Sequence, residues 1–301
     1  MKLFLKNTWK HRAHVVMSLP AVLLFFFFSY VPMAGLVLAF KDFDYKLGLW
    51  KSPWCGLENF QFLLASKTTF WNITKNTLFY YVIFTVLCTI LEVVLAIALD
   101  QLMFKKFGKA MQSIMIIPIF ISYTAVQFIV YAYLNSDTGL INNLLGIRVR
   151  WYMEAKFWPA ILTVVKIWSG VGYGSVLYMS VLAGIDTQLY EAAEIDGANK
   201  WQQIRNVTLP SLVPMISIML LLSVGGMMHS DTGLFYQVTR NSGTLYPTTQ
   251  VLDSYVLNAI FTSSNFGFTA AATFFQSVVG TALILAANGV VRKLGPENAL
   301  F

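Results

Sequence analysis

The chain has 301 residues, of which 57% are hydrophobic and 12% are charged, with a formal net charge of +7 at pH 7. Average soluble proteins carry about 25% charged residues, so a soluble domain of this length is excluded and an integral membrane protein is indicated. Two distant cysteines and three scattered histidines predict neither a disulfide framework nor a metal site.

Six apolar runs are long enough to cross a bilayer, which takes about 20 residues of helix. The first run is far longer than the apolar core of a signal peptide, which has about 7–15 residues, so we expect it to remain as a span. The sequence therefore predicts an all-α polytopic membrane protein with six transmembrane helices. The predicted spans are His14–Phe40, Thr77–Leu99, Met111–Leu134, Phe157–Ala183, Leu209–Met228 and Ala270–Val291.

The distribution of basic residues predicts the orientation. Six crossings place both termini on one side, together with the loops between spans two and three and between spans four and five. That side carries eleven Lys and Arg residues in short segments, against nine spread over longer loops on the other side. The denser side is predicted to be cytoplasmic. We therefore expect a multi-pass protein of the bacterial cytoplasmic membrane, with both termini inside. The same bias explains the net charge, so no nucleic-acid partner is expected.

Two features inside the spans leave alternatives open. Glu92 and Lys166 are ionisable, and each costs about 2.5–3.5 kcal/mol at mid-membrane on insertion scales. They either form a structural pair or line a pathway. The fourth span contains Gly170, Gly172 and Gly174. The spacing of Gly170 and Gly174 favours close helix packing, and local unwinding beside a cavity is the alternative.

The outer loops contain one short repeat. The pentapeptide SDTGL occurs at Ser136–Leu140 and again at Ser230–Leu234, each time after an outward-running span. Its Asp and Gly suit a helix end and a turn, so shared turn chemistry is predicted, with a duplicated substrate-side element as the alternative. A short amphipathic helix is expected over Leu245–Phe261.

A polar island, Glu191–Pro210, separates the fourth and fifth apolar runs and reads EAAEIDGANKWQQIRNVTLP. Asp186 is predicted to cap a helix over Thr187–Asp196, because its carboxylate can accept the free N–H groups of the first turn. Gly197 is predicted to end that helix. A second short helix is expected to end at Val207, before Pro210 starts the fifth span. The prediction is a helix–turn–helix elbow in the cytoplasm.

The island resembles the EAA motif of membrane subunits of binding-protein-dependent ABC importers, through its Glu-Ala-Ala, the spaced Gly197 and the final Leu-Pro. The segments WSGVGYG, LYPTTQVLDSYV and FFQSVVGTALILAAN resemble the sugar-permease branch, above all the permeases for complex oligosaccharides. The resemblance covers about residues 15–295. It implies a type I, MetI-like permease domain at 72–291, preceded by an N-terminal segment, helix and outside loop at 1–71 and followed by a cytoplasmic tail at 292–301.

The resemblance also implies partners and a mechanism. Two homologous permease subunits pair in the lipid bilayer, two ATPase subunits dock on their elbows, and an extracellular solute-binding protein delivers the substrate. ATP and Mg would bind to the ATPase subunits, so this chain is expected to hold no cofactor and to be a non-catalytic subunit of an ATP-hydrolysing complex. The implied docking residues are Asp186, Tyr190, Glu191, Ala192, Ala193, Glu194, Asp196 and Gly197.

The cargo predicted from the resemblance is an oligosaccharide. Sugars pair apolar ring faces with many hydroxyls, so aromatic and amide side chains in or near the spans are candidates for its pathway, although each also suits core packing. The alternatives are the same importer class with a non-sugar cargo, or an ATP-independent secondary transporter, which gives no reason for the motif. The candidate pathway residues are Tyr123, Gln127, Trp168, Tyr173 and Gln276.

Overall fold

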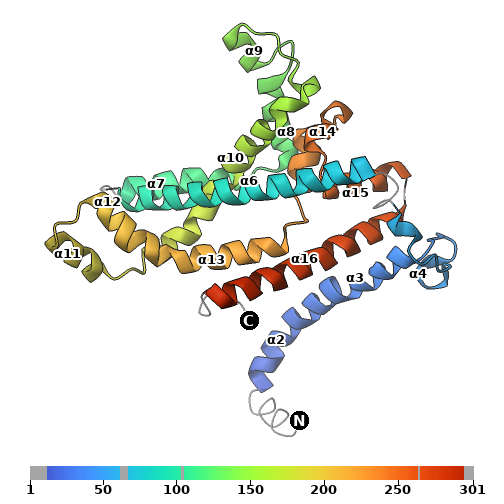
Figure 1. The fold of residues 1–301 in the computed structure, drawn as a ribbon, viewed down its shortest axis with the longest axis horizontal. Coiled ribbons are helices and arrows are strands. Elements are labelled where there is room, and N and C mark those ends of the chain that lie inside the picture. The colour runs from blue at the N-terminus through green and yellow to red at the C-terminus, as the bar shows by residue number, and fades with distance from the viewer. Residues whose placement is uncertain (1–11, 62–66, 103–104, 264, 295–301) are drawn as a thin grey trace. The chain divides into compact units, whose positions relative to one another are not determined.

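The computed structural model describes residues 12–61, 67–102, 105–263 and 265–294 (Figure 1). The chain divides into two compact units, residues 1–65 with 259–275 and residues 66–258 with 276–301. Within the described residues the elements are helices, and the only β pairing is an isolated antiparallel bridge between Lys41 and Trp54. The all-α membrane fold is confirmed, whereas the boundaries predicted near residues 71 and 291 stay a prediction.

The first described element of this unit is a helical run of 29 residues, Arg12–Phe40. Its apolar side chains are exposed as far as Met33, as a lipid-facing span requires, and the last turns are partly buried. Asn59 fastens the following loop to the end of this run, because its amide donates to the carbonyls of Leu38 and Lys41 at 3.2 and 2.9 Å. The helical elements up to residue 61 are α2 Arg12–Phe25, η1 Phe26–Tyr30, α3 Val31–Met33, η2 Ala34–Phe40, α4 Gly48–Lys51 and η3 Glu58–Phe60.

The second unit holds most of the remaining helices, and α15 and α16 run across the boundary between the units. Its elements in chain order are α6 Lys67–Asp100, α7 Lys105–Ile116, η4 Ile117–Phe120, α8 Tyr123–Leu134, α9 Leu140–Leu145, η5 Trp151–Met153, η6 Ala155–Phe157, α10 Trp158–Leu182, α11 Thr187–Ile195, α12 Lys200–Gln203, η7 Ile204–Thr208, α13 Leu209–Gly225, η8 Leu234–Val238, η9 Gly243–Leu245, α14 Tyr246–Thr249, α15 Leu252–Ser263 and α16 Phe266–Leu294.

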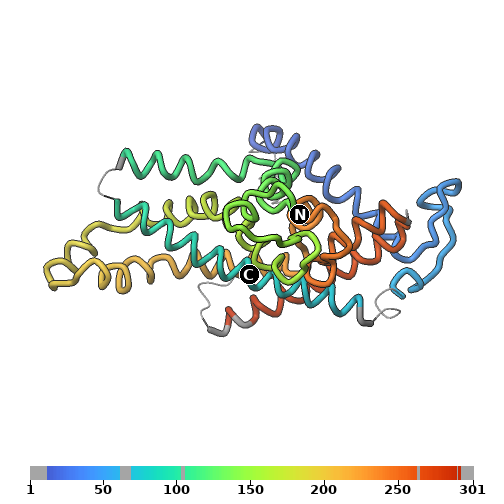
Figure 2. The backbone as a smooth tube through the Cα atoms, turned by 90° about the horizontal axis from the view of Figure 1, so that it is seen from above, coloured from blue at the N-terminus to red at the C-terminus, as the bar shows by residue number. Residues whose placement is uncertain are grey.

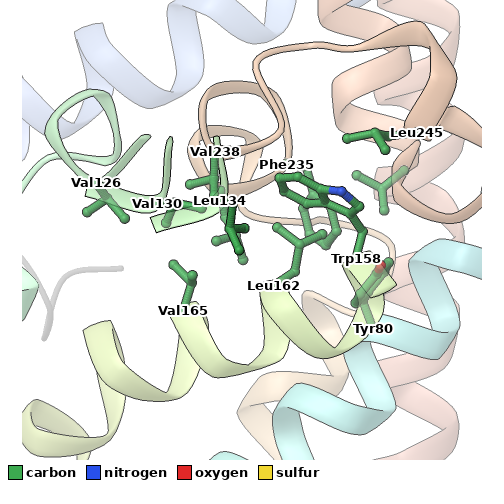
Figure 3. Packing of buried hydrophobic residues seen from close by; sticks show 12 residues of the cluster. Tyr80, Val126, Val130, Leu134, Trp158, Leu162, Val165, Phe235, Val238 and Leu245 are labelled. Atoms are coloured by element: carbon green, nitrogen blue, oxygen red, sulfur yellow. The ribbon is translucent and has the colours of Figure 1, made fainter. Parts of the chain in front are cut away.

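Helix α10 lies at the centre of the second unit and packs most extensively against α6. One face of α10 presents Trp158, Leu162 and Val165, spaced four and three residues apart, to α8 and η8 (Figure 3). The first two of these side chains are fully buried. Lipid is as apolar as leucine, so close packing and not water exclusion holds such helices together in a bilayer.

The predicted third span, Met111–Leu134, is wrong as one continuous helix. The chain bends by 98° between residues 106–120 and 123–134. Pro118 lies in the short 3-10 helix before the bend, and Ile121 is extended. Ser122 then caps α8, its hydroxyl accepting from the Ala125 N–H. A proline and a new N-cap within five residues end one helix and start another. Among the described residues, five single helices and this bent pair are long and apolar enough to span a membrane.

The fifth span also differs from its prediction, because it starts before Pro210. Residues Lys200–Gly225 form one continuous helical run that passes through a π turn at Ile204–Thr208. In that turn the Leu209 N–H donates to the Ile204 carbonyl, five residues back. Proline cannot supply the next helical N–H, and the wider turn accommodates this missing donor. The second elbow helix and the fifth span are therefore one rod.

The helix predicted over Leu245–Phe261 is broken into α14 and α15. The chain is extended at Gln250, and two hydroxyls then accept the N–H groups that start α15. Ser254 Oγ accepts from Val251 at 3.1 Å, and Thr77 Oγ1, on α6, accepts from Leu252 at 3.0 Å. The long-range bond to Thr77 is not visible in the local pattern, which explains the incorrect single helix.

Candidate functional site

The elbow, residues Asp186–Thr208, is the turn that joins α10 to α13, at the far end of α10 from α9 (Figures 1 and 2). Asp186 caps α11 as predicted, accepting from the Gln188 N–H at 3.0 Å. Gly197 has the predicted left-handed conformation, with φ of +78°. Around it, the Gly197 N–H donates to Glu194 and the Ala198 N–H to Ala193. These two bonds form a Schellman motif, which satisfies the last carbonyls of α11.

Short-range bonds hold the second half of the elbow against the first. Asn199 and Gln202 form a capping box at the start of α12. Lys200 Nζ donates to Glu194 Oε1 at 2.8 Å, and this hydrogen bond holds the pKa of Glu194 below its usual value. Tyr190 Oη lies 3.0 Å from Thr208 Oγ1, which ties α11 to the base of α13. The geometry of the elbow is therefore set within the elbow itself.

The predicted docking residues divide into two groups. Asp186, Tyr190, Glu194 and Gly197 shape the elbow, and their polar groups are used inside it. Glu191, Ala192 and Asp196 are exposed, whereas Ala193 is half-buried.

The sequence pattern did not predict that three large apolar side chains of the elbow are exposed. Leu189 is 52% exposed, Trp201 68% and Ile195 87%. Large apolar residues within a polar island were the signal that could have found them. Exposed large apolar side chains in a segment rich in carboxylates are typical of an interaction surface.

A second site is a cavity of about 380 Å³ among α6, α10 and α13, which we call the charged pocket. Two ionisable groups face it from different helices, Glu92 on α6 and Lys166 on α10. Tyr173, Cys88, Thr89 and Ser223 add polar atoms to its wall. Ionisable groups within spans are expected to face protein or water, and both do so here.

Lys166 forms its ion pair with Asp231 and not with Glu92. Its ammonium nitrogen lies 3.0 Å from Asp231 Oδ2, and both side chains are 30% exposed. Among the described residues Glu92 has no cation within salt-bridge distance. The structural pair of Glu92 with Lys166 is therefore wrong, and the pathway-lining alternative stays a prediction.

The glycines that allow close packing of α10 are not the pair that the spacing predicted. A side chain at Gly172 would collide with the backbone of Met115 on α7, and one at Gly174 would collide with the Glu92 carboxylate. Gly170 has open space around its Cβ position. Close approach therefore uses Gly172, and Gly174 makes room for a charged side chain. The predicted contact through Gly170 is wrong, since that position faces the pocket.

Of the five candidate pathway residues, Tyr173 lines the charged pocket and is 53% exposed. The other four lie elsewhere. Tyr123 is half-buried, with its hydroxyl 3.5 Å from Ser169 Oγ. Gln127 is half-buried on α8, and Trp168 is 42% exposed on α10. The amide of Gln276 is buried and donates to Met228 O and Asp253 Oδ1, both at 2.8 Å. Their role in transport stays a prediction.

The two SDTGL copies share a role and differ in their surroundings. Each precedes a short helix, α9 in the first copy and η8 in the second. Asp231 Oδ1 accepts from the Leu234 N–H at 3.4 Å while its other oxygen binds Lys166. Asp137, at the same position of the first copy, is exposed. In the first copy the turn acceptor is instead Asn135 Oδ1, which accepts from the N–H groups of Asp137 and Thr138. The predicted turn role of the Asp is thus seen in the second copy, which also provides a charge to the pocket region.

Comparisons with known proteins place this geometry in a family. Residues 4–296 match the profile of the binding-protein-dependent transport system inner membrane component. The polygalacturonan/rhamnogalacturonan transport system permease protein YteP of Bacillus subtilis is 30% identical over 287 residues, which cover 94% of this chain and 88% of YteP. Protein LplB of the same organism is 29% identical over 94% of this chain and 89% of LplB.

Solved structures agree. A chain of a bacterial ABC transporter involved in the import of the acidic polysaccharide alginate matches with a TM-score of 0.86 at 28% identity, over 98% of this chain and 100% of that one. A second structure holds that kind of transporter in complex with an alginate pentasaccharide-bound periplasmic protein, with a TM-score of 0.84, 28% identity, and coverage of 96% and 97%. With the full helical core matched, this chain belongs to the family of binding-protein-dependent transport system inner membrane components.

Proposed function

We propose that this chain forms half of the translocation pathway of an ATP-driven importer, paired with a second permease subunit, and that it moves an oligosaccharide delivered by an extracellular binding protein. In this proposal two ATPase subunits bind ATP and Mg and hydrolyse the nucleotide, and the elbow of this chain transmits their motion to α10 and α13. The chain itself then performs no catalysis.

The observation that carries the proposal is the elbow. Its conformation is held by its own hydrogen bonds, and it exposes Ile195 and Trp201 in the same segment as Glu191 and Asp196. Exposed apolar anchors rimmed by charge are the usual centre of a protein interface. Because α12 continues into α13 as one rod, a force on the elbow acts directly on a membrane span.

The saccharide cargo is supported by the relatives and by the pocket. The names of YteP and of the alginate transporter state polysaccharide transport for those proteins. In this chain the charged pocket combines Tyr173 with hydroxyl, carboxylate and ammonium groups, which suits a ligand with apolar ring faces and many hydroxyls. The paired subunit would complete the wall.

The experiment is ATP hydrolysis by the complex reconstituted in proteoliposomes, with and without saccharide-loaded binding protein. Trp201→Ala should reduce stimulated hydrolysis by at least tenfold, since anchor truncation at an interface costs about 2 kcal/mol or more. Glu191→Lys should also reduce it at least tenfold, because it reverses a charge at the proposed interface. Leu144→Ala, on exposed α9 far from the elbow, is the matched control and should change it less than twofold. Normal stimulation in both elbow variants would contradict the coupling role.

The same preparation separates the alternatives. Uptake of saccharide without ATPase subunits would indicate a secondary transporter. ATP-dependent uptake of a peptide or phosphate compound, with no saccharide uptake, would keep the importer class and change the cargo.

We further propose that both termini and the elbow are cytoplasmic. The test is labelling of Cys55 in intact cells by a membrane-impermeant thiol reagent, in a Cys88→Ser background. Cys55 lies between α4 and η3 and is a free, half-buried thiol. Labelling without permeabilisation is expected, and labelling only after permeabilisation would reverse the orientation.

A further inference from the structure

A small hollow lies among the loops at the α9 end of the second unit, away from the charged pocket. It has a volume of about 300 Å³, at the lower end of the range of small-molecule sites. Its wall comes from the end of α8, from η5 and from the turn after η8. The residues that the argument uses are Tyr131, Asn135, Asp137, Tyr152, Arg240 and Ser242.

Arg240 is the central group of this hollow. Its guanidinium lies over the Tyr131 ring, 4.2 Å from the ring centroid. Within the described part of the chain, no carboxylate lies within salt-bridge distance of Arg240. Stacking on a ring face orients the planar guanidinium and leaves the N–H groups on its edge available for a ligand. A cation held in place without an anion is suited to bind one.

The backbone at Arg240 is held in an unusual conformation. Arg240 and Asn241 have φ of +55° and +48°, in the left-handed region that non-glycine residues seldom adopt. Asn241 is fixed there by hydrogen bonds with Asn258 and Tyr246, at 2.8–3.0 Å. Strain of this kind persists only where the surrounding structure enforces it, and it gathers at functional sites.

The rest of the wall is equally fixed. The rings of Tyr131 and Tyr152 meet edge to face with centroids 5.7 Å apart. The Tyr152 hydroxyl donates to Val238 O at 3.4 Å, and the Tyr152 carbonyl accepts from Thr244 Oγ1 at 2.8 Å and from Ser242 Oγ at 3.5 Å. Burial raises the pKa of Tyr152 to about 12, so its phenol stays protonated. The two loops are thus joined into one preformed surface.

We infer that this hollow is a binding subsite for a carboxylate-bearing saccharide, with Arg240 on the carboxylate, the tyrosine rings against the sugar ring, and Asp137 and Ser242 on its hydroxyls. Arg240 matches a carboxylate with two parallel hydrogen bonds. Asp137 accepts from hydroxyls. This combination favours an acidic sugar over an acidic protein segment, which offers carboxylates without the hydroxyls. The inference rests on the saccharide cargo proposed above and narrows it to an acidic class.

The test measures binding directly on the purified full chain in lipid nanodiscs, by ligand-observed NMR titration with trigalacturonate and with neutral maltotriose. Trigalacturonate should bind, and maltotriose should bind at least tenfold more weakly. Arg240→Asn removes the guanidinium and suits the left-handed backbone. It should weaken trigalacturonate binding at least tenfold, because hydrogen bonds to charged groups are the strong ones. Arg240→Lys keeps the charge without the planar fork and should lose several-fold.

Arg148→Asn is the matched control. Arg148 is exposed and lines a neighbouring hollow without the tyrosines, so its loss should change affinity less than twofold. Equal losses of trigalacturonate affinity in Arg148→Asn and Arg240→Asn would mean that both arginines act through nonspecific electrostatic attraction and not through a defined subsite. Unchanged binding in Arg240→Asn, or equal binding of maltotriose, would overturn the subsite. So would a loss of affinity for the unloaded binding protein in Arg240→Asn with trigalacturonate binding intact, which would indicate a protein contact.

This readout needs no ATPase subunit and no second permease subunit. Absence of trigalacturonate binding therefore overturns the subsite, whereas loss of stimulated ATP hydrolysis in the elbow variants concerns the proposed coupling role alone.

Discussion

The elbow and the charged pocket are built in opposite ways. The bonds of the elbow join residues that lie at most 18 positions apart, the longest being the contact between Tyr190 and Thr208. The groups around the charged pocket come from three distant segments, with Glu92 on α6, Lys166 on α10 and the ion-pair partner Asp231 after α13. A substitution in the elbow should therefore disturb only local structure, whereas a substitution in the pocket region should disturb the packing of the whole second unit.

The largest effect is expected when the long-range ion pair is broken. Asp231→Asn keeps an oxygen for the Leu234 N–H but leaves Lys166 without its carboxylate. We expect a loss of about 2–3 kcal/mol in unfolding free energy, somewhat less than for a fully buried pair because both side chains are 30% exposed. Unfolding in mixed micelles measures it. Asp137→Asn, the same position of the first SDTGL copy, is the control and should stay within about 0.5 kcal/mol.

A second variant sharpens this prediction. Lys166→Met combined with Asp231→Asn removes both charges and should recover most of the stability, because neither partner is then left unpaired. If Asp231→Asn and Asp137→Asn cost the same, the pocket region is no more dependent on distant contacts than the loops are.

The next-largest effect on stability is expected where α10 and α7 approach each other closely. Gly172→Ala places a methyl group against the Met115 backbone of α7, and such overpacking costs about 1–3 kcal/mol. Gly170→Ala, two residues earlier in α10, has open space and should stabilise by about 0.5–1 kcal/mol through helix propensity. Thermal denaturation of the two variants in nanodiscs checks the opposite signs. The same sign in both would mean that α10 and α7 do not approach as described.

Loss of the elbow cap should be smaller and local. Asp186→Ala removes the acceptor of the Gln188 N–H and should weaken the start of α11 by about 1 kcal/mol. Hydrogen exchange at Gln188 should then be about fivefold faster. Exchange in α10 should not change. Asp186→Asn caps equally well and is the control. Faster exchange throughout α10 would break the distinction between a local elbow and a long-range pocket.

The smallest expected effect is a pH dependence of stability that arises from His229, whose contact with Asp253 is long-range and partly exposed to solvent. His229 Nδ1 lies 3.7 Å from Asp253 Oδ1, and this contact raises the pKa of His229 above its usual 6.5. Burial alone would raise the pKa of Asp253, but hydrogen bonds from His229, Gln276 and Ser230 hold it below its usual value.

The sign follows from the raised pKa of His229. The stabilisation that the protonated His229 provides is complete below pH 6.5, the usual pKa in the unfolded state. It disappears as the pH rises through the higher pKa of the folded state. The imidazole is 49% exposed, so we expect a loss of at most about 1 kcal/mol in unfolding free energy. Thermal denaturation from pH 5.5 to 8.5 measures it, and His229→Gln should flatten the profile in this range. A steeper profile in His229→Gln would assign the dependence to other groups.

A structural feature could be predicted from the sequence where its hydrogen bonds join residues that are close in the chain. The Asp186 cap and the Gly197 turn were visible as residue types at fixed positions, because a capping carboxylate and a left-handed glycine act on their immediate neighbours. The break of the third span was missed although Pro118 and Ser122 were in view, since hydropathy is continuous across them. The exposed side chains of Ile195 and Trp201 were not predicted, because neither residue belongs to the EAA motif.

By itself the sequence determined the membrane class, the apolar segments that can span it, the elbow and its family signature, because hydrophobicity, charge count and capping are local properties. The tertiary structure alone decided which ionisable groups meet. Lys166 lies 65 residues from Asp231 and 74 from Glu92 in the chain, and no local pattern ranks these two carboxylates as partners. That choice depends on how α6, α10 and the second SDTGL segment pack, and the same packing left Asp137 exposed and joined Asp231 to a span.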